Sequence, residues 1–83
     1  MIPFTQVALR LHADDDVGVA KLPLKAGMVL QLDGQPLSLT ADIGRGHKMA
    51  IRPRVDGDPV RKYGQVIGFA RGTIRPGDHV HLH

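Results

Sequence analysis

The sequence lacks cysteine, tryptophan and glutamate. Without cysteine, neither a disulfide framework nor a thiolate metal site can stabilise the chain. All eight acidic side chains are aspartate, which favours turns, while the strong helix former glutamate is missing. No apolar run approaches the roughly 18–20 residues that span a membrane, and no basic segment followed by an apolar signal core opens the chain. We therefore expect a cytoplasmic protein that depends on packing alone.

Glycine and proline are frequent instead. Ten glycines and six prolines are spread along 83 residues, with short apolar runs between them. Glycine and proline between short apolar runs are typical of an all-β domain. A chain of this length forms one domain, here residues 1–83. We predict seven or eight short strands, with an Asp33-Gly34 hairpin turn between two of them. The predicted strands span residues 7–12, 17–21, 28–32, 37–40, 47–52, 59–62, 66–70 and 79–83.

Three glycines recur in a similar setting. Gly27, Gly57 and Gly77 each have a proline within four residues upstream and an aliphatic residue at the third position downstream. Such a pattern predicts a corner where glycine takes a backbone conformation that other residues avoid, followed by a buried strand. Three corners in so short a chain predict a folded-over β structure.

Charge is unevenly distributed. Residues 1–42 carry three basic and five acidic side chains, a balance of −2, whereas residues 43–83 carry eight basic and three acidic ones, a balance of +5. The second half should attract anions, and five histidines would add positive charge in mild acid. Only three aromatic residues are present, too few for a nucleic-acid stacking platform. A small anionic ligand is therefore favoured over nucleic acid.

Histidines at the C-terminal end alternate with aliphatic residues. His79, His81 and His83 alternate with Val80 and Leu82, so on a strand the three imidazoles share one face. Histidines two residues apart have Cα atoms about 6.6 Å apart, from a rise of ~3.3 Å per residue, which lets both rings bind one metal ion. A solvated edge strand with outward histidines explains the pattern as well.

Three other segments place polar groups where a ligand could bind. His12 precedes three aspartates, which suits a proton carrier or a metal ligand, although a surface histidine in an acidic turn fits equally. In the segment 44–48, two glycines let the backbone approach a ligand, and Arg45, His47 and Lys48 offer a carboxylate fork, a proton carrier and a point charge, unless they are simply solvated. Tyr63 could donate to a substrate oxygen, but a core anchor with its hydroxyl at the rim is favoured.

Four collinear segments resemble one family in combination. They are residues 12–20, 46–52, 60–68 and 77–83, which contain Gly46-His47-Lys48, a Lys-Tyr-Gly-x-x-Ile-Gly block at 62–68 and the terminal His-x-His-x-His. From about Val7 onward the chain resembles the N-terminal module of altronate and galactarate dehydratases, an SAF domain of the β-clip type. It is also similar to the small subunit of sulfolactate sulfo-lyase.

The chain departs from the family pattern at three positions. Asp16 stands where the resemblance leads us to expect asparagine, Gly18 where alanine is usual, and Arg45 where phenylalanine is frequent. We expect Asp16 to add negative charge beside His12, which bears on the choice of substrate more than on the family.

The resemblance implies a hydro-lyase that removes water from a sugar acid next to its carboxylate, with a divalent metal, Fe²⁺ or Mn²⁺. The chain would be a separate small subunit, inactive alone, working with a large catalytic subunit and open to homo-oligomer formation. The alternatives are a (2R)-sulfolactate sulfo-lyase small subunit, a carbohydrate-binding SAF module and a purely structural assembly module. The expected site residues are His12, His47, Lys48 and His79 for catalysis, Arg45 and Tyr63 for substrate binding, and His12, His79 and His81 for the metal.

Overall fold

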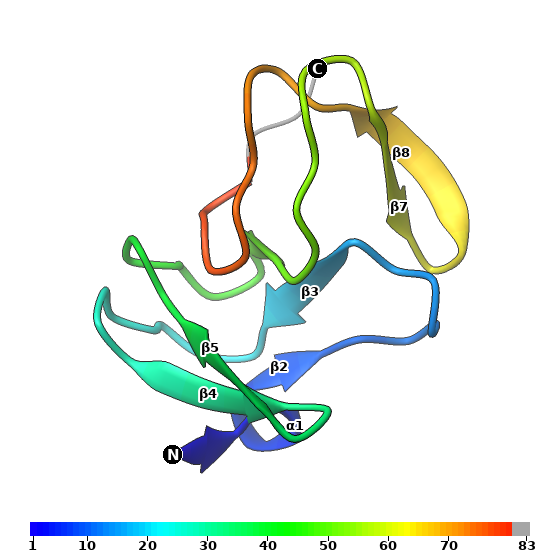
Figure 1. Ribbon diagram of the computed structural model, residues 1–83. Coiled ribbons are helices and arrows are strands. Elements are labelled where there is room, and N and C mark those ends of the chain that lie inside the picture. Colours follow the sequence, from blue (N-terminus) through cyan, green and yellow to red (C-terminus); the bar gives the residue numbers. More distant parts are fainter. Residues whose placement is uncertain (81–83) are drawn as a thin grey trace.

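The computed structural model describes residues 1–80 and confirms an all-β domain (Figure 1). Within these residues lie eight short strands and one four-residue helix, and no helix is long and apolar enough to span a membrane. The elements are β1 (Ile2–Pro3), α1 (Phe4–Val7), β2 (Ala8–Leu9), β3 (Val17–Ala20), β4 (Val29–Leu32), β5 (Gln35–Ser38), β6 (Lys48–Ala50), β7 (Pro59–Lys62) and β8 (Gln65–Phe69).

The strands form three small sheets. Their orders are β1-β4-β5, β2-β3-β6 and β7-β8, and only the β1–β4 pair is parallel. A single antiparallel bridge between Met49 and His79 extends the middle sheet beyond β6. That bridge confirms extended backbone at the start of the predicted strand 79–83, whose residues 81–83 lie outside the described chain.

Two hairpins of the same geometry lie 30 residues apart. Asp33 and Gly34 connect β4 to β5 with φ angles of 51° and 77°, and Tyr63 and Gly64 connect β7 to β8 with φ angles of 55° and 76°. Two consecutive positive φ angles are the signature of a tight two-residue hairpin turn. The Asp33-Gly34 prediction is confirmed. The core-anchor interpretation of Tyr63 is wrong, because the turn places it at the hairpin tip, where it is 49% exposed.

The predicted glycine corners are present, and the structure adds a fourth. Gly27, Gly57 and Gly77 have φ angles of 88°, 88° and 93°, and Gly46 has 79°. Each donates its backbone N–H to a carbonyl on another segment, namely Leu39, Ala70, Ala50 and Ala20 respectively. The corner at Gly77 is the tightest, because a Cβ there would lie 1.9 Å from the Ser38 carbonyl oxygen. The corner at Gly46 has no nearby proline, so the pattern missed it.

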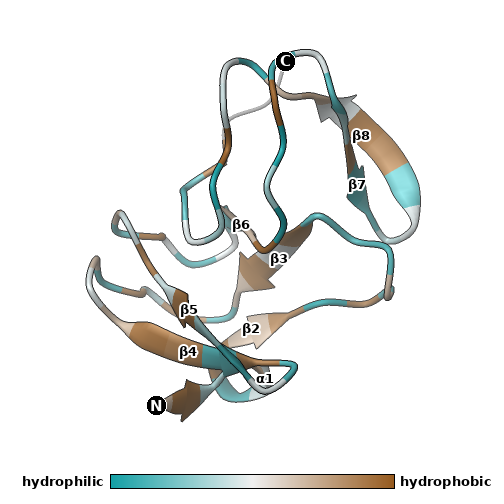
Figure 2. Ribbon diagram, in the orientation of Figure 1, coloured by the Kyte–Doolittle hydropathy of each residue, from teal (hydrophilic) through white to brown (hydrophobic). Residues whose placement is uncertain are grey.

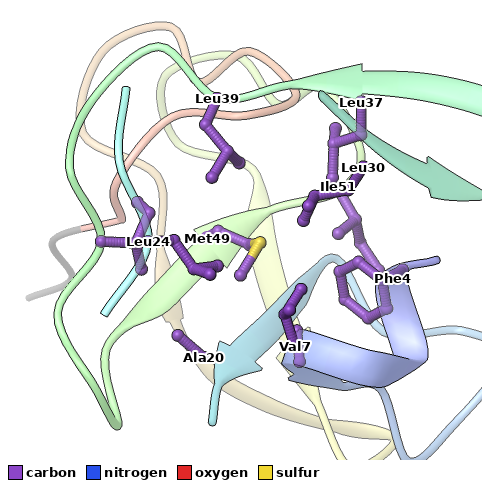
Figure 3. Close-up of a cluster of buried hydrophobic side chains, with 11 residues drawn as sticks. Phe4, Val7, Ala20, Leu24, Leu30, Leu37, Leu39, Met49 and Ile51 are labelled. Carbon is purple, nitrogen blue, oxygen red and sulfur yellow. The ribbon is translucent and has the colours of Figure 1, made fainter. Parts of the chain in front are cut away.

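The core consists of two clusters on opposite sides of the β3–β6 pair. The larger cluster is shown in Figure 3 and includes Phe4, Leu30 and Met49. The smaller one contains Val17, Ala50, Val60, Ala70, Ile74 and Val80. Consecutive residues Met49 and Ala50 of β6 join different clusters, as side chains on opposite faces of a strand must. The β2-β3-β6 sheet therefore lies between two halves of the domain, one built on the larger cluster and the other on the smaller cluster.

The predicted strand 7–12 is wrong over most of its length. Residues 4–7 form α1, and β2 covers only Ala8–Leu9. Leu9 and Leu11 are exposed, whereas Val7 and Ala8 are buried, so the apolar alternation does not follow the buried face. Packing of Phe4 and Val7 into the larger cluster overrides the local pattern. The other predicted strands up to residue 70 are each matched by a strand, with ends that differ by up to two residues.

Asp16 is a buried junction between the two halves. Its side chain, 1% exposed, forms an ion pair with the Arg54 guanidinium and accepts the Arg61 backbone N–H at 2.8 Å. Its own N–H donates to the Arg61 carbonyl, and its carbonyl accepts the N–H of Ile51. The hydrogen bond to Asp16 raises the pKa of Arg54, although burial alone lowers it. Arg54 therefore balances the extra negative charge that Asp16 was expected to add beside His12.

Asp15 is also buried and fixes the second hairpin. Its carboxylate accepts the Gly64 backbone N–H at 2.8 Å. Burial on its own raises the pKa of Asp15, but backbone hydrogen bonds from Gly64, Tyr63 and His12 outweigh it, and the pKa lies below its ordinary value of 3.8. Hydrogen bonds to the charged form are thus the dominant effect.

The lowered pKa predicts acid-labile stability. Because the folded-state pKa lies below the unfolded one, the contribution of Asp15 is fully present above about pH 4 and is lost as the pH falls through the folded-state pKa. Asp15→Asn should lower stability at neutral pH by on the order of 1 kcal/mol and flatten the dependence on pH below about 4. Urea unfolding as a function of pH measures both. Asp14→Asn keeps the buried carboxylate and is the control; a variant D15N with the wild-type pH profile would contradict the assignment.

Gly18 leaves room for an aromatic ring. A Cβ at this position would lie 2.5 Å from Cζ of Phe4 and 3.2 Å from the Leu9 carbonyl oxygen. Phe4 is itself 2% exposed in the larger cluster. The departure from the alanine of the resemblance is therefore explained by packing, since the Phe4 ring occupies the space of the missing methyl group.

Gly18→Ala should consequently destabilise the domain by about 1–3 kcal/mol through overpacking. Thermal unfolding measures the effect, and combining Gly18→Ala with Phe4→Leu should recover part of the loss through coupling between neighbours. Gly44→Ala is the matched control, because a Cβ at Gly44 meets nothing closer than 3.4 Å. Simple additivity of the two core substitutions would show that the ring and the glycine are not in contact.

Candidate functional site

His47 and His79, two of the predicted site residues, lie in direct contact. Nδ1 of His47 and Nε2 of His79 are 2.9 Å apart, and the ring centroids are 5.2 Å apart with planes tilted by 32°. One nitrogen of such a pair donates and the other accepts. The structure thus brings together two histidines that lie 32 residues apart in the chain.

The backbone around the pair explains this meeting. The corner at Gly46 turns the chain into β6, and the N–H of His47 donates to the Gly44 carbonyl at 3.0 Å. The His47 ring lies over Gly44, where a Cβ would be 3.4 Å from ring carbon Cδ2. His79 enters opposite Met49, and the N–H of Val80 donates to the Lys48 carbonyl. The β6 register therefore aligns the two rings.

Arg45 and Lys48 flank this pair along the chain. Arg45 is exposed in the turn before His47, and Lys48 is partly buried in β6 opposite Val19. Both cations lie within two residues of His47 in the chain. Their predicted roles in holding an anionic oxygen remain predictions.

His12 belongs to a second group of residues, at the tip of the β7–β8 hairpin. Its Nδ1 accepts the Asp14 backbone N–H at 3.1 Å, and a Cβ on Gly64 would lie 3.1 Å from its ring. Next to Gly64 in the turn, the Tyr63 ring lies 4.6 Å below the Lys62 ammonium, a cation–π contact. The structure thus unites His12 with the Tyr63 turn and places His47 with His79.

A three-ligand metal centre is not complete within the described residues. Among residues 1–80, no three side chains of histidine or aspartate gather closely enough to hold one ion. His12 therefore does not join His47 and His79 in one set. His81, the third predicted ligand, lies outside the described chain. Metal binding by His12, His79 and His81 stays a prediction.

A cavity of about 310 Å³ lies elsewhere, beside the tip of the β4–β5 hairpin. Arg10, Asp33 and Arg52 contribute its polar groups, and Leu32, Leu37 and Ile51 are among its apolar ones. None of the predicted site residues that the structure describes lines this cavity. The imidazole groups are surface features rather than the lining of an enclosed pocket.

Sequence reasoning missed two features of the site. The aspartates after His12 were treated as turn residues, yet Asp15 holds the Gly64 N–H on which the His12 group depends. His47 and His79 were expected in one site together with His12, and the separate position of His12 was missed. A signal did exist for the β7–β8 hairpin. Gly27 and Gly57 are 30 residues apart, and the same spacing separates the Asp33-Gly34 turn from Tyr63-Gly64, which predicts a second turn there.

Comparison with known proteins adds an independent line of information. The family described as "Altronate/galactarate dehydratase SAF domain" matches residues 6–83. Altronate dehydratase of Escherichia coli (strain K12) is 41% identical over 75 residues, and that of Bacillus subtilis (strain 168) is 35% identical over 75 residues. Each alignment covers 90% of this chain and 15% of the relative, so the chain spans about 15% of the length of these enzymes.

A second kind of relative is closer in length. The (2R)-sulfolactate sulfo-lyase subunit alpha of Chromohalobacter salexigens is 37% identical over 78 residues, covering 86% of this chain and 83% of the relative. The name of that relative describes one subunit of an enzyme. With the family match extending over almost the whole sequence, the chain belongs to the altronate/galactarate dehydratase SAF domain family.

Proposed function

We propose that the chain is the small component of a two-component sugar-acid dehydratase of the altronate or galactarate type. It supplies imidazoles to a site completed by a larger catalytic subunit. The observation that carries this proposal is the His47–His79 pair at 2.9 Å in a chain 41% identical to an altronate dehydratase segment. A cytoplasmic location is part of the same proposal.

The chemistry suits the residues of the pair. Removal of water requires a base for the proton beside the carboxylate, donors for the enediolate that results, and an acid for the departing hydroxide. Two imidazoles with nitrogens 2.9 Å apart hold one proton between them and can pass it on. Lys48 and Arg45, next to His47 in sequence, bind the carboxylate of the substrate; Tyr63 serves as a further hydroxyl donor.

A divalent ion, Fe²⁺ or Mn²⁺, fits the same two nitrogens. The ion would be held by His47 Nδ1 and His79 Nε2, which lie 2.9 Å apart, and would replace the proton that they share. Imidazole is a suitable ligand for iron. The ion would supply Lewis-acid stabilisation of the substrate oxygens. Its other ligands come from outside residues 1–80, either from His81 or from the partner.

Replacing either histidine should therefore weaken metal binding. We expect Co²⁺, used as a spectroscopic probe, to bind the full chain, and His47→Ala or His79→Ala to lower the affinity at least about tenfold. Absorption titration measures this. Gln31→Ala, on the exposed face of β4, is the control. Unchanged affinity in both histidine variants would place the metal elsewhere.

A larger partner is supported by the exposed apolar residues of β8. Val66, Ile67 and Phe69 are exposed, Phe69 by 58%, and Figure 2 shows much of this outer strand in brown. Within residues 1–80, β8 pairs only with β7. Exposed apolar clusters of this kind mark interaction sites. In altronate dehydratases the matched segment is 15% of a longer chain, so the occupant we propose is the remaining, catalytic part of such an enzyme.

Co-expression tests the proposed function directly. The chain should co-purify with a dehydratase-type large subunit that lacks this module, and the complex should dehydrate D-altronate or galactarate, whereas the chain alone should not. Phe69→Asp should reduce complex formation about tenfold or more. Leu22→Asp, at an apolar residue 42% exposed in the other half, is the matched control.

The outcomes separate the alternatives. Binding of sugar acids by the chain without partner or metal would identify a carbohydrate-binding module. Full activity of a complex that carries both His12→Ala and His79→Ala would leave only a structural assembly role. Either result would contradict the proposal.

The second candidate is the small subunit of a (2R)-sulfolactate sulfo-lyase. One observation favours it, namely that the chain covers 83% of such a subunit but 15% of altronate dehydratase. Assaying the same complex with sulfolactate distinguishes the two, because the leaving group is sulfite in one case and water in the other.

A further inference from the structure

His12 is held in place on several sides. Its ring lies over Gly64, its Nδ1 accepts the Asp14 backbone N–H at 3.1 Å, and its carbonyl accepts the Asp15 N–H at 3.1 Å. The Asp15 carboxylate accepts the Gly64 N–H, so it also fixes the turn on which the His12 ring packs. Even so, the His12 side chain is 50% exposed.

The contact with Asp14 determines where the imidazole proton lies. A backbone N–H can only donate, so Nδ1 of His12 is an acceptor in this arrangement, and the Asp14 carboxylate, 3.8 Å from Nδ1, lies beyond hydrogen-bond distance. In a neutral imidazole with an acceptor Nδ1, the proton is on Nε2. The free nitrogen of His12 is therefore a hydrogen-bond donor, and the lone pair that a metal needs is already engaged.

We infer that His12 is a fixed hydrogen-bond donor, through Nε2–H, to an oxygen of an anionic hydroxy acid. This donor role differs from both roles that the sequence leaves open for His12, a proton carrier and a metal ligand. The neighbouring Lys62, held over the Tyr63 ring, adds positive charge at the same hairpin tip. The inference deepens the proposed function and rests on it only for the identity of the ligand.

The two hairpins provide a matched pair of variants. Gly64 and Gly34 have nearly equal φ angles, 76° and 77°, so alanine is strained at both. A Cβ at Gly64 would lie 3.1 Å from the His12 ring, whereas a Cβ at Gly34 would meet nothing within 4 Å. Gly64→Ala therefore displaces the imidazole, and Gly34→Ala reproduces the backbone strain alone.

Proton placement is measured on the ¹⁵N-labelled full chain by long-range ¹H–¹⁵N correlation at a pH where the ring is neutral. The expected result is a His12 ring protonated almost wholly on Nε2, more so than in the same chain unfolded in urea. Gly34→Ala should keep the His12 ring protonated on Nε2. Gly64→Ala should shift it toward the mixture of Nε2 and Nδ1 tautomers found in the unfolded chain. A ring protonated on Nδ1, or the unfolded mixture in the wild-type chain, would overturn the inference whatever enzyme the chain belongs to.

The donor role is measured in the assembled enzyme. His12→Ala should lower kcat/KM by about 10- to 100-fold, the range for a hydrogen bond to a charged group, mainly through KM. His12→Gln keeps an N–H donor at the place of Nε2 and should recover most of the loss, which neither a metal ligand nor a proton carrier would allow. Failure of glutamine to rescue would overturn the inference. If the assembly is inactive even with the wild-type chain, the proposed function is refuted. The position of the His12 proton is then judged by the NMR spectra alone.

Discussion

The buried contact between Asp16 and Arg54 joins the two halves of this domain. The smaller core cluster has six buried residues, none larger than isoleucine, and so contributes limited apolar burial. What attaches the second half is a polar junction at Asp16, whose carboxylate meets Arg54 and the Arg61 N–H. Removing Arg54 leaves the buried Asp16 carboxylate without a counter-charge, which costs more than the intact pair contributes.

The segment of residues 10–15, which precedes Asp16, contacts the tips of both the β4–β5 and the β7–β8 hairpin. At its start, Arg10 forms a bidentate ion pair with Asp33 at 2.8 and 2.9 Å, at the tip of the β4–β5 hairpin. At its end, Asp15 holds Gly64 at the tip of the β7–β8 hairpin. His12 lies between these two anchors, which explains how a loop residue obtains a fixed orientation. Loops that carry function are commonly held in this way by a rigid scaffold.

Local chemistry predicted the turns, and long-range packing decided the rest. Asp33-Gly34 and the corner glycines 27, 57 and 77 could be predicted because each requires a backbone conformation that its own residues favour. The N-terminal helix could not, because the burial of Phe4 depends on the missing side chain of Gly18. The histidines could be chosen by type, but their division into two groups depends on strand register, which no local pattern contains.

Both imidazole groups are open to solvent. His12 is half exposed and His79 only partly buried, and hydrogen bonds and charges that face water are weakened by its dielectric constant. The β7–β8 hairpin carries both the exposed apolar strand β8 and the turn on which His12 packs. The subunit that we propose to dock on β8 would therefore approach His12 and would remove water from its Nε2–H. On this proposal, docking of the subunit would also strengthen the His12 donor, because the hydrogen bond would then form in a medium of lower dielectric constant.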